Sequence, residues 1–230
     1  MSKIKSIQEA LQPVKSGDTI LVGGFGLIGA PLSLIEGLIE KDDISNLTIV
    51  SNNLGEAGKG LGALLNQGKI SKGIGSYFTS NRDVGELYKK GKIQLELNPQ
   101  GTLAERMRAG GAGIPAFYTP TSYGTELGKN KEIREFNGKW YVMEKALRGN
   151  VAIIRAHKAD KLGNLVYYKT ARNFNPVMAT AADYVIAEVD EIVETGELDP
   201  EAVVTPFLYV DAIVKANMIL TNEGVVRKND

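Results

Sequence analysis

The sequence predicts an α/β fold in which a mostly parallel sheet is covered by helices and carries an inserted β-hairpin region. Compact apolar runs alternate with amphipathic segments from the start of the chain, which is typical of helices packed on a parallel sheet. The alternation is interrupted once by an Asn-Gly pair between two extended runs, and it then resumes. No linker, internal repeat or low-complexity tract is visible, so residues 1–230 are predicted to form a single domain.

Short apolar runs that end in glycine or polar residues predict the buried strands. In the first half of the chain these runs cover 19–22, 47–50, 73–78 and 93–97. The hairpin is expected within 122–150, with its turn at Asn137-Gly138. Segments 151–156 and 165–168 are expected to pair in antiparallel fashion. The strand–helix alternation then resumes at 176–182, 184–189 and 208–214.

Capping residues predict where the helices between these strands begin. Ser6 with Glu9, and Thr102 with Glu105, have the spacing of a capping box. Asn81 is a candidate N-cap for a helix that stops near Gly91. Further helices are expected after Pro31, which suits a first helical position, and around 61–65.

The composition excludes several classes of function. The 27 basic and 27 acidic residues balance, so there is no positive excess for a nucleic-acid partner. Cysteine is absent, which excludes disulfides and thiolate metal sites. With His157 as the single histidine, a metal centre would have to be built from carboxylates, and none is predicted. No signal-peptide core and no apolar stretch of about 20 residues is present, which predicts a cytoplasmic protein without a membrane span.

A glycine-rich segment over 23–29 follows the first predicted strand. Its Gly24, Gly26 and Gly29 have the G-x-G-x-x-G spacing of a dinucleotide site. That site also needs an acidic residue about 20 positions further on, at the end of the second strand. The second strand ends instead in Ser51-Asn52-Asn53. Three interpretations stay open: a loop facing an anion or oxyanion, a turn needed only for strand–helix packing, and nicotinamide binding.

Amide side chains follow two of the predicted strands. Asn52 and Asn53 come directly after 47–50, and Gln100 lies between 93–97 and the next helix. Sites in open α/β sheets form at the carboxyl ends of the strands, where a neutral amide can donate to a developing oxyanion. Ordinary loop turns at the asparagines and a surface role for Gln100 are the alternatives.

Other polar positions give weaker signals. The segment 110–113 is either a helix C-cap or a backbone approach to a ligand, and Arg172 suits phosphate or carboxylate. Asn175 before Pro176 is either a helix N-cap or, with Arg172 and Asn173, one of three polar groups placed before a helix to contact a ligand. No Ser or Asp partner is evident for His157, and no carboxylate stands out as a nucleophile.

The ordered set of motifs resembles the A (alpha) subunit of the 3-oxoacid coenzyme A transferase family. The first motif is Val-Gly-Gly-Phe-Gly-Leu-Ile-Gly-Ala-Pro at 22–31, and the similarity covers nearly the whole chain, with the hairpin region least similar. The further matching segments are 51–53, 99–106, 110–113, 171–176 and 191–198.

The resemblance implies transfer of coenzyme A between an acyl-CoA substrate and a free short-chain carboxylate. In this family a glutamate of the B (beta) subunit, in a Ser-Glu-Asn-Gly setting, attacks the thioester and then carries the CoA. That tetrapeptide is absent from this sequence, so the chain is expected to be half of an enzyme, in an A2B2 complex. The resemblance does not decide between which two acids CoA is exchanged; acetoacetate, succinate, acetate and butyrate are all candidates.

The resemblance also assigns roles to residues. It implies that Gln100 is catalytic, as an oxyanion donor, and that Asn52 and Asn53 hold the substrate, with Gly111 and Gly113 also at the substrate. The CoA or acyl group is expected to lie against Gly23, Gly24, Phe25, Gly26, Leu27, Ile28 and Gly29. A contact between Arg172 and substrate is not decided. The alternatives are an NAD(P)-binding oxidoreductase and a non-catalytic subunit that only stabilises its partner.

Overall fold

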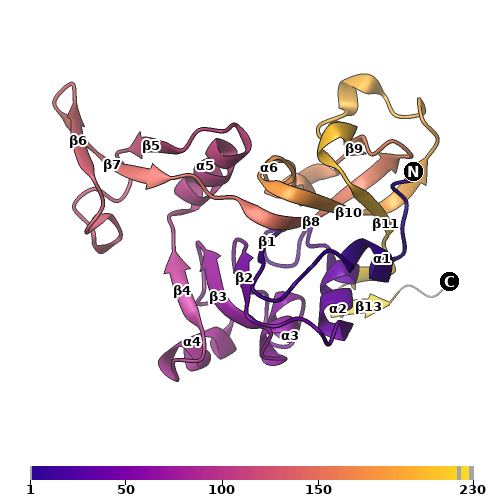
Figure 1. Ribbon diagram of the computed structural model, residues 1–230, viewed down its shortest axis with the longest axis horizontal. Coiled ribbons are helices and arrows are strands. Elements are labelled where there is room, and N and C mark those ends of the chain that lie inside the picture. The colour runs from indigo at the N-terminus through magenta and orange to yellow at the C-terminus, as the bar shows by residue number, and fades with distance from the viewer. Residues whose placement is uncertain (1, 222–223, 228–230) are drawn as a thin grey trace.

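The structure, a computed structural model, describes residues 2–221 and 224–227. In this part of the chain an eight-stranded sheet has the order β11-β10-β8-β1-β2-β3-β4, in which all neighbours are parallel. β9 joins it antiparallel to β8 (Figure 1). The strands are β1 (Thr19–Val22), β2 (Leu47–Val50), β3 (Ile70–Gly75), β4 (Gln94–Leu97), β8 (Gly149–Asp160), β9 (Leu165–Val166), β10 (Ala182–Val193) and β11 (Ala212–Lys215).

The central strands β1 and β2 are mostly apolar, as expected for a sheet that is covered on both faces. Ile20 and Val22 of β1 pack into the core on one face, and Leu21 between them packs into the core on the other face. The alternation follows from the period of two residues in a strand. Two separate cores, one on each side, therefore hold the sheet.

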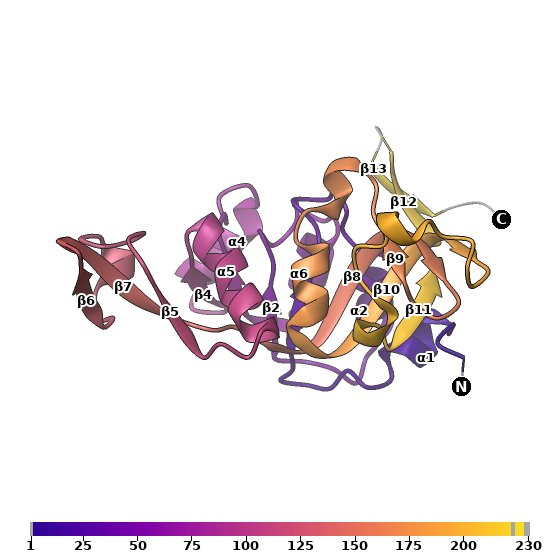
Figure 2. The same ribbon diagram turned by 90° about the horizontal axis from the view of Figure 1, so that it is seen from above.

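Helices cover these two faces (Figures 1 and 2). The core that contains Ile20 is closed by α1 (Ile7–Leu11), α2 (Leu32–Glu40), α3 (Leu61–Asn66) and α4 (Arg82–Lys89). The core that contains Leu21 is closed by α5 (Gln100–Gly111) and α6 (Asn175–Thr180). The predicted α/β class, a mostly parallel sheet covered by helices, is confirmed.

Two of the predicted helix starts are confirmed by their hydrogen bonds. The backbone N–H of Glu9 donates to Ser6 Oγ at 3.2 Å, and Glu9 Oε2 accepts the backbone N–H of Ser6 at 2.9 Å. At α4, Asn81 Oδ1 accepts the N–H of Asp83 at 3.0 Å. Both signals depend only on residues three or fewer apart, which is why the sequence alone shows them.

Four local predictions were wrong. Pro31 is the N-cap of α2 rather than its first helical residue. The second capping box does not form, because Pro99 is the N-cap of α5 and the buried Thr102 Oγ1 has no hydrogen-bond partner. The helix begins at Gln100, so Thr102 lies inside its first turn instead of preceding it. Asn175 is the first residue of α6 rather than its cap, because its side chain turns into the protein interior. The third strand is Ile70–Gly75 instead of 73–78.

An arm projects from the body of the molecule (Figures 1 and 2). It consists of β5 (Ala116–Thr119), β7 (Lys139–Lys145) and β6 (Ile133–Phe136), paired antiparallel in that order. The hairpin predicted from Asn137-Gly138 is confirmed, and both residues have positive φ, 50° and 76°. This is the geometry that favours Asn-Gly in two-residue hairpin turns. β5 was not predicted, since its four residues carry no turn signal of their own.

The remaining elements are small. A hairpin of β12 (Met218–Thr221) and β13 (Gly224–Arg227) lies near the start of α2. Short 3-10 helices occur at η1 (Glu126–Gly128), η2 (Lys169–Arg172), η3 (Pro200–Ala202) and η4 (Phe207–Tyr209). None of the helices in residues 2–221 and 224–227 has the length and apolar character to cross a bilayer.

Candidate active site

The carboxyl ends of β1 to β4 meet at one edge of the sheet. Because these neighbouring strands are parallel, the residues that follow them lie side by side. Asn52 follows β2, Ser76 follows β3, and Gln100 begins α5 just after β4. The N–H of Asn98 donates to the carbonyl oxygen of Gly75 at 2.8 Å, which ties the end of β4 to that of β3. The sequence therefore places polar side chains from separate loops in one cluster.

A chain of hydrogen bonds connects the glycine-rich loop to Gln100. The backbone N–H of Gly26 donates to Asn52 Oδ1 at 3.2 Å. Asn52 Nδ2 then donates to Ser76 Oγ at 3.2 Å and to Gln100 Oε1 at 3.3 Å. The Ser76 hydroxyl also contacts Gln100 Oε1. The predicted residues Asn52 and Gln100 are thus brought together, and Ser76, which the sequence analysis did not identify, lies between them.

The direction of these bonds fixes the orientation of both amides. A backbone N–H can only donate, so the atom of Asn52 that faces Gly26 is its oxygen, and its NH2 group faces Gln100. Gln100 must therefore turn its oxygen towards Asn52. Its own NH2 group points away from the cluster, on an exposed side chain. The cluster presents a neutral donor at the edge of the sheet, the type of group that stabilises an oxyanion.

Asn53 is not part of this cluster. Its Oδ1 accepts the N–H of Gly55 at 3.0 Å, and its Nδ2 donates to Ser80 Oγ at 3.4 Å. The side chain is buried, and both contacts are within the loops that follow β2 and β3. These contacts are those of a loop-forming asparagine, so a direct hold on substrate by Asn53 stays a prediction.

Most backbone N–H groups of the glycine-rich loop donate to acceptors within the protein. Phe25 and Ile28 exchange backbone hydrogen bonds of 2.9 and 3.2 Å, which closes a tight turn. Gly23 donates to Ile153 O at 3.0 Å and Gly24 to Asn173 Oδ1 at 3.1 Å. The N–H groups of Gly23, Gly24, Phe25, Gly26 and Ile28 all have protein acceptors, which disfavours an anion held by these backbone groups. Contact of the loop 23–29 with the CoA or acyl group stays a prediction.

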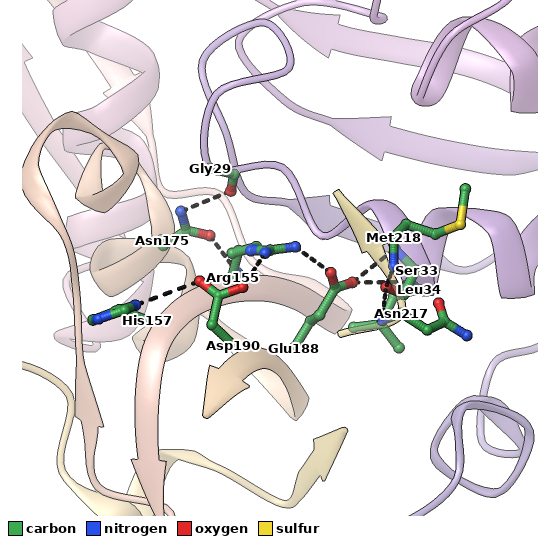
Figure 3. Close-up of polar contacts among 10 residues, drawn as sticks. All are labelled: Gly29, Ser33, Leu34, Arg155, His157, Asn175, Glu188, Asp190, Asn217 and Met218. Atoms are coloured by element: carbon green, nitrogen blue, oxygen red, sulfur yellow. Dashed lines mark hydrogen bonds and ion pairs between the residues drawn. The ribbon is translucent and has the colours of Figure 1, made fainter. Parts of the chain in front are cut away.

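The start of α2 is also occupied by the protein itself. Glu188 of β10 accepts the N–H groups of Ser33 at 2.9 Å and of Leu34 at 3.1 Å through Oε2 (Figure 3). Its Oε1 forms an ion pair with Arg155 of β8. Burial raises the pKa of Glu188 to about 7, although Arg155 and the N–H groups oppose the rise. The anion at this helix N-terminus is therefore a side chain of the chain, not a ligand.

The ion pair extends into a charged cluster between β8 and β10. Arg155 contacts Asp190 Oδ1 at 2.5 Å, and His157 Nδ1 lies 3.4 Å from Asp190 Oδ2 (Figure 3). His157 therefore has the Asp partner that the sequence analysis did not find. Arg155 and Glu188 are directly opposed in the β8–β10 register. The available signal was a pair of polar positions two apart at the end of an apolar run in each strand, 155 and 157 in β8 and 188 and 190 in β10.

The other predicted residues lie elsewhere. α5 runs from Gln100 at the carboxyl edge to Gly111 at the opposite end, where a Cβ on Gly111 would lie 2.2 Å from Thr180 Oγ1. Close packing of α5 on α6 explains this glycine, and Gly113 follows the end of the helix with φ of 72°. Their contact with substrate stays a prediction. Arg172 is exposed in η2.

A cavity of about 280 Å³ adjoins the glycine-rich loop, and Asn52 is not among the residues that line it. Leu27, His157, Asp190 and Tyr168 are among the residues that line it. Among the described residues, no group of three or more His, Asp or Glu side chains has the spacing to hold a metal ion.

The fold and the site define an α/β protein with neutral amide donors at the carboxyl edge of a parallel sheet. The model of the family described as "Coenzyme A transferase" matches residues 4–216. The chain belongs to the coenzyme A transferase family, as the resemblance indicated.

Curated relatives cover most of the chain. The A (alpha) subunit of the succinyl-CoA:3-ketoacid coenzyme A transferase of Xanthomonas campestris pv. campestris (strain B100) is 55% identical, over 87% of this chain and 83% of the relative. The protein of that name from Helicobacter pylori (strain J99) is 52% identical, over 92% and 91%. The corresponding alpha chain of the 3-oxoadipate CoA-transferase of Pseudomonas putida is 50% identical, over 91% of each. The chain is thus an A (alpha) subunit of this family of enzymes.

Solved structures share the fold. Glutaconate coenzyme A-transferase from Acidaminococcus fermentans superposes with a TM-score of 0.83 at 22% identity, over 94% of this chain and 76% of that one. An acyl-CoA transferase from E. coli O157:H7, in a thioester complex with CoA, gives 0.81 at 24% identity, over 94% and 47%.

Proposed function

We propose that this chain is the oxyanion-binding half of a 3-oxoacid CoA-transferase. The enzyme exchanges CoA between an acyl-CoA and a free carboxylate, acetoacetate on one side and succinate, acetate or butyrate on the other. The observation that carries the proposal is the fixed orientation of Gln100, whose amide oxygen is held by Asn52 and Ser76 and whose NH2 group faces outward. The names of the relatives, which include succinyl-CoA:3-ketoacid and 3-oxoadipate transferases, support the substrate class.

The chemistry needs donors but no titratable base. A glutamate carboxylate of the partner attacks the thioester carbonyl, and the carbonyl oxygen becomes an oxyanion that accepts from Gln100 Nε2. Collapse of this intermediate breaks the C–S bond, leaving a mixed anhydride and a CoA thiolate. The thiolate then attacks the glutamyl carbonyl and releases the first acid as its carboxylate. The reverse steps load the second acid. Each attacking group is already an anion, so the neutral amides are sufficient.

The nucleophile is expected on a B subunit docked at the carboxyl edge. The sequence has no Ser-Glu-Asn-Gly segment, and Gln100 is exposed. Phe25, Ile28, Tyr77 and Leu97, which follow or end strands at this edge, are between 48% and 55% exposed. Large apolar side chains that are exposed close together are typical of a protein–protein interface. An A2B2 assembly with this edge covered would place a partner carboxylate beside Gln100.

Replacing Gln100 tests the proposal in the complex of this chain with its B subunit. Gln100→Ala should lower kcat for CoA exchange between acetoacetyl-CoA and succinate or acetate by about 10²–10³, the usual cost of an oxyanion donor. Gln100→Glu, which keeps an acceptor for Ser76 but loses both donors, should be similarly slow. Gln67→Ala, at the exposed C-cap of α3, is the matched control and should leave the rate unchanged.

Two results would contradict the proposal. Unchanged turnover in Gln100→Ala would show that the chain only stabilises its partner. Exchange by the isolated chain, freed of any partner, would show that the reactive carboxylate is its own. Binding of NADH, followed by fluorescence, would support the nicotinamide alternative, which the occupied N–H groups of the glycine-rich loop disfavour.

A further inference from the structure

We propose that Ser76 is a positioning residue that makes Gln100 a hydrogen-bond donor to the reacting oxygen. The inference rests on the proposed function and names a residue that neither the motifs nor the resemblance identifies. Ser76 is the first residue after β3, half-buried between Asn52 and Gln100. Its role depends on which acceptor receives its single hydroxyl hydrogen.

The backbone around Ser76 leaves one destination for that hydrogen. The carbonyl oxygen of Asn52 accepts the N–H groups of Ser76 at 3.0 Å and Tyr77 at 3.1 Å. A carbonyl oxygen has two lone pairs, so both are used. The Ser76 hydroxyl also lies 3.2 Å from this oxygen, but it is closer to Gln100 Oε1. Since Asn52 Nδ2 already donates to Ser76 Oγ, the hydroxyl accepts from Asn52 and donates to Gln100.

The resulting chain of donors runs in one direction, from the N–H of Gly26 through Asn52 and Ser76 to Gln100. The terminal torsion of glutamine is broad and roughly two-fold, so an unrestrained amide also populates the flipped state. In that state Gln100 would present its oxygen, an acceptor, to a developing oxyanion. Two donors on Oε1 oppose the flipped state, and the contact from Ser76 is much the shorter of the two. We therefore expect the weaker contact from Asn52 alone to be insufficient to hold one orientation.

Removal of the hydroxyl should therefore slow the reaction through Gln100 alone. In the complex with the B subunit, Ser76→Ala is expected to lower kcat about tenfold, in line with one hydrogen bond, and to leave KM for the acyl-CoA unchanged. Ser76→Thr keeps the hydroxyl and should retain most of the rate. Ser71→Ala, at the other end of β3 with its hydroxyl on Leu47 O, is the matched control and should be unaffected.

A double-mutant cycle separates positioning from an independent role. In the Gln100→Ala background, Ser76→Ala should cause no further loss of kcat, because no amide remains to be oriented. A further tenfold loss in that background, an unaffected Ser76→Ala enzyme, or a Thr variant as slow as the Ala variant would each overturn the inference. If instead Gln100→Ala itself were fully active, the proposed function would fail, whatever the Ser76 variants did.

A second measurement does not depend on activity. Neutron crystal structures of the complex with the B subunit, which distinguish amide oxygen from amide nitrogen, should show Gln100 in one orientation in the wild type and in Ser76→Thr, and in both orientations in Ser76→Ala. Thermal unfolding of the three proteins checks that each is folded. A Ser76→Ala structure in which Gln100 keeps the wild-type orientation would overturn the positioning role.

Discussion

Asn175 is a fully buried side chain that joins segments distant in the sequence. Its Oδ1 accepts the N–H of Arg155 at 2.8 Å, and its Nδ2 donates to Gly29 O at 3.1 Å and to Ala171 O at 2.9 Å. A Cβ on Gly23 would lie 1.8 Å from Asn175 Oδ1. Glycine at position 23 is therefore required by this buried amide, whatever else the loop contacts.

Gly23→Ala should lower the free energy of unfolding by about 1–3 kcal/mol, because the methyl group displaces Asn175 and its partners. The matched control is Gly85→Ala, inside α4, where a Cβ has nothing within 4 Å. That change should raise stability by about 0.5–1 kcal/mol, since alanine favours a helix. Urea unfolding of the three proteins measures both effects. Equal stability of the two variants would contradict the packing explanation.

At the scale of an element, α2 depends on a side chain from a distant strand. Its N-cap is Pro31, which offers no side-chain hydrogen bond, and Glu188 supplies the missing acceptors instead. Burial brings the pKa of Glu188 to about 7 in the folded chain, against an ordinary value of 4.5. The folded state thus holds this proton more tightly than the unfolded state does.

The titration of Glu188 should be visible in the pH dependence of the free energy of unfolding. Its contribution to the free energy of unfolding is largest below pH 4.5, falls as the pH rises to 7, and is constant above that pH. The fall amounts to at most about 3–4 kcal/mol, at about 1.36 kcal/mol per pKa unit. In Glu188→Gln this fall should be absent. Urea unfolding between about pH 4.5 and 8 tests it, with Glu36→Gln on the same helix as control.

A variant Glu188→Gln that keeps the wild-type slope between pH 4.5 and 7 would show that another group causes it. The charged neighbours to consider are Arg155, Asp190 and His157, which form one cluster with Glu188. Parallel measurements on Arg155→Met would identify a contribution of the ion pair.

At the scale of the whole molecule, the arm and the body are held by different contacts. The arm has its own aromatic cluster, in which Phe136 makes edge contacts with Tyr118 and Tyr141, and Tyr123 stacks on Trp140. The body depends on the two cores of the sheet.

Removal of the arm should leave the body folded. Ala116 and Lys145 are directly paired across β5 and β7, so residues 117–144 can be replaced by an Asn-Gly turn. Lys145 is retained because its carbonyl oxygen accepts from Arg106 Nε at 2.8 Å. The shortened chain should keep its helical circular dichroism and unfold in one cooperative transition. Loss of cooperativity would show that the arm is part of the folding unit.

Much of the fold could be predicted from local signals in the sequence. The Ser6–Glu9 box, the Asn81 cap and the Asn137-Gly138 turn each depend on neighbouring residues, and each is confirmed. Thr102 and Asn175 were misassigned because the start of α5 at Gln100 and tertiary burial override local capping preferences.

The site was accessible to sequence reasoning only in part. Asn52 and Gln100 follow strands, so the strand-end rule finds them. Glu188 and Arg155 are 33 residues apart and meet only through the register of two parallel strands. The orientation of Gln100 depends on Ser76, whose place is set by where β3 ends, and that end was predicted three residues too late.

The carboxylate of Glu188 has a consequence for how a nucleotide-bearing ligand can sit on this chain. A phosphate aimed at the first turn of α2 would have to expel an internal counter-ion that already saturates the Ser33 and Leu34 amides. Expulsion would break the ion pair of Glu188 with Arg155, whose other partner is Asp190, and would leave a buried carboxylate without its two amide donors, which is a costly exchange. If the proposed function holds, the phosphates of coenzyme A should therefore bind somewhere other than the N-terminus of α2. Only the sulfur end of coenzyme A should approach Asn52 and Gln100 at the edge of the sheet.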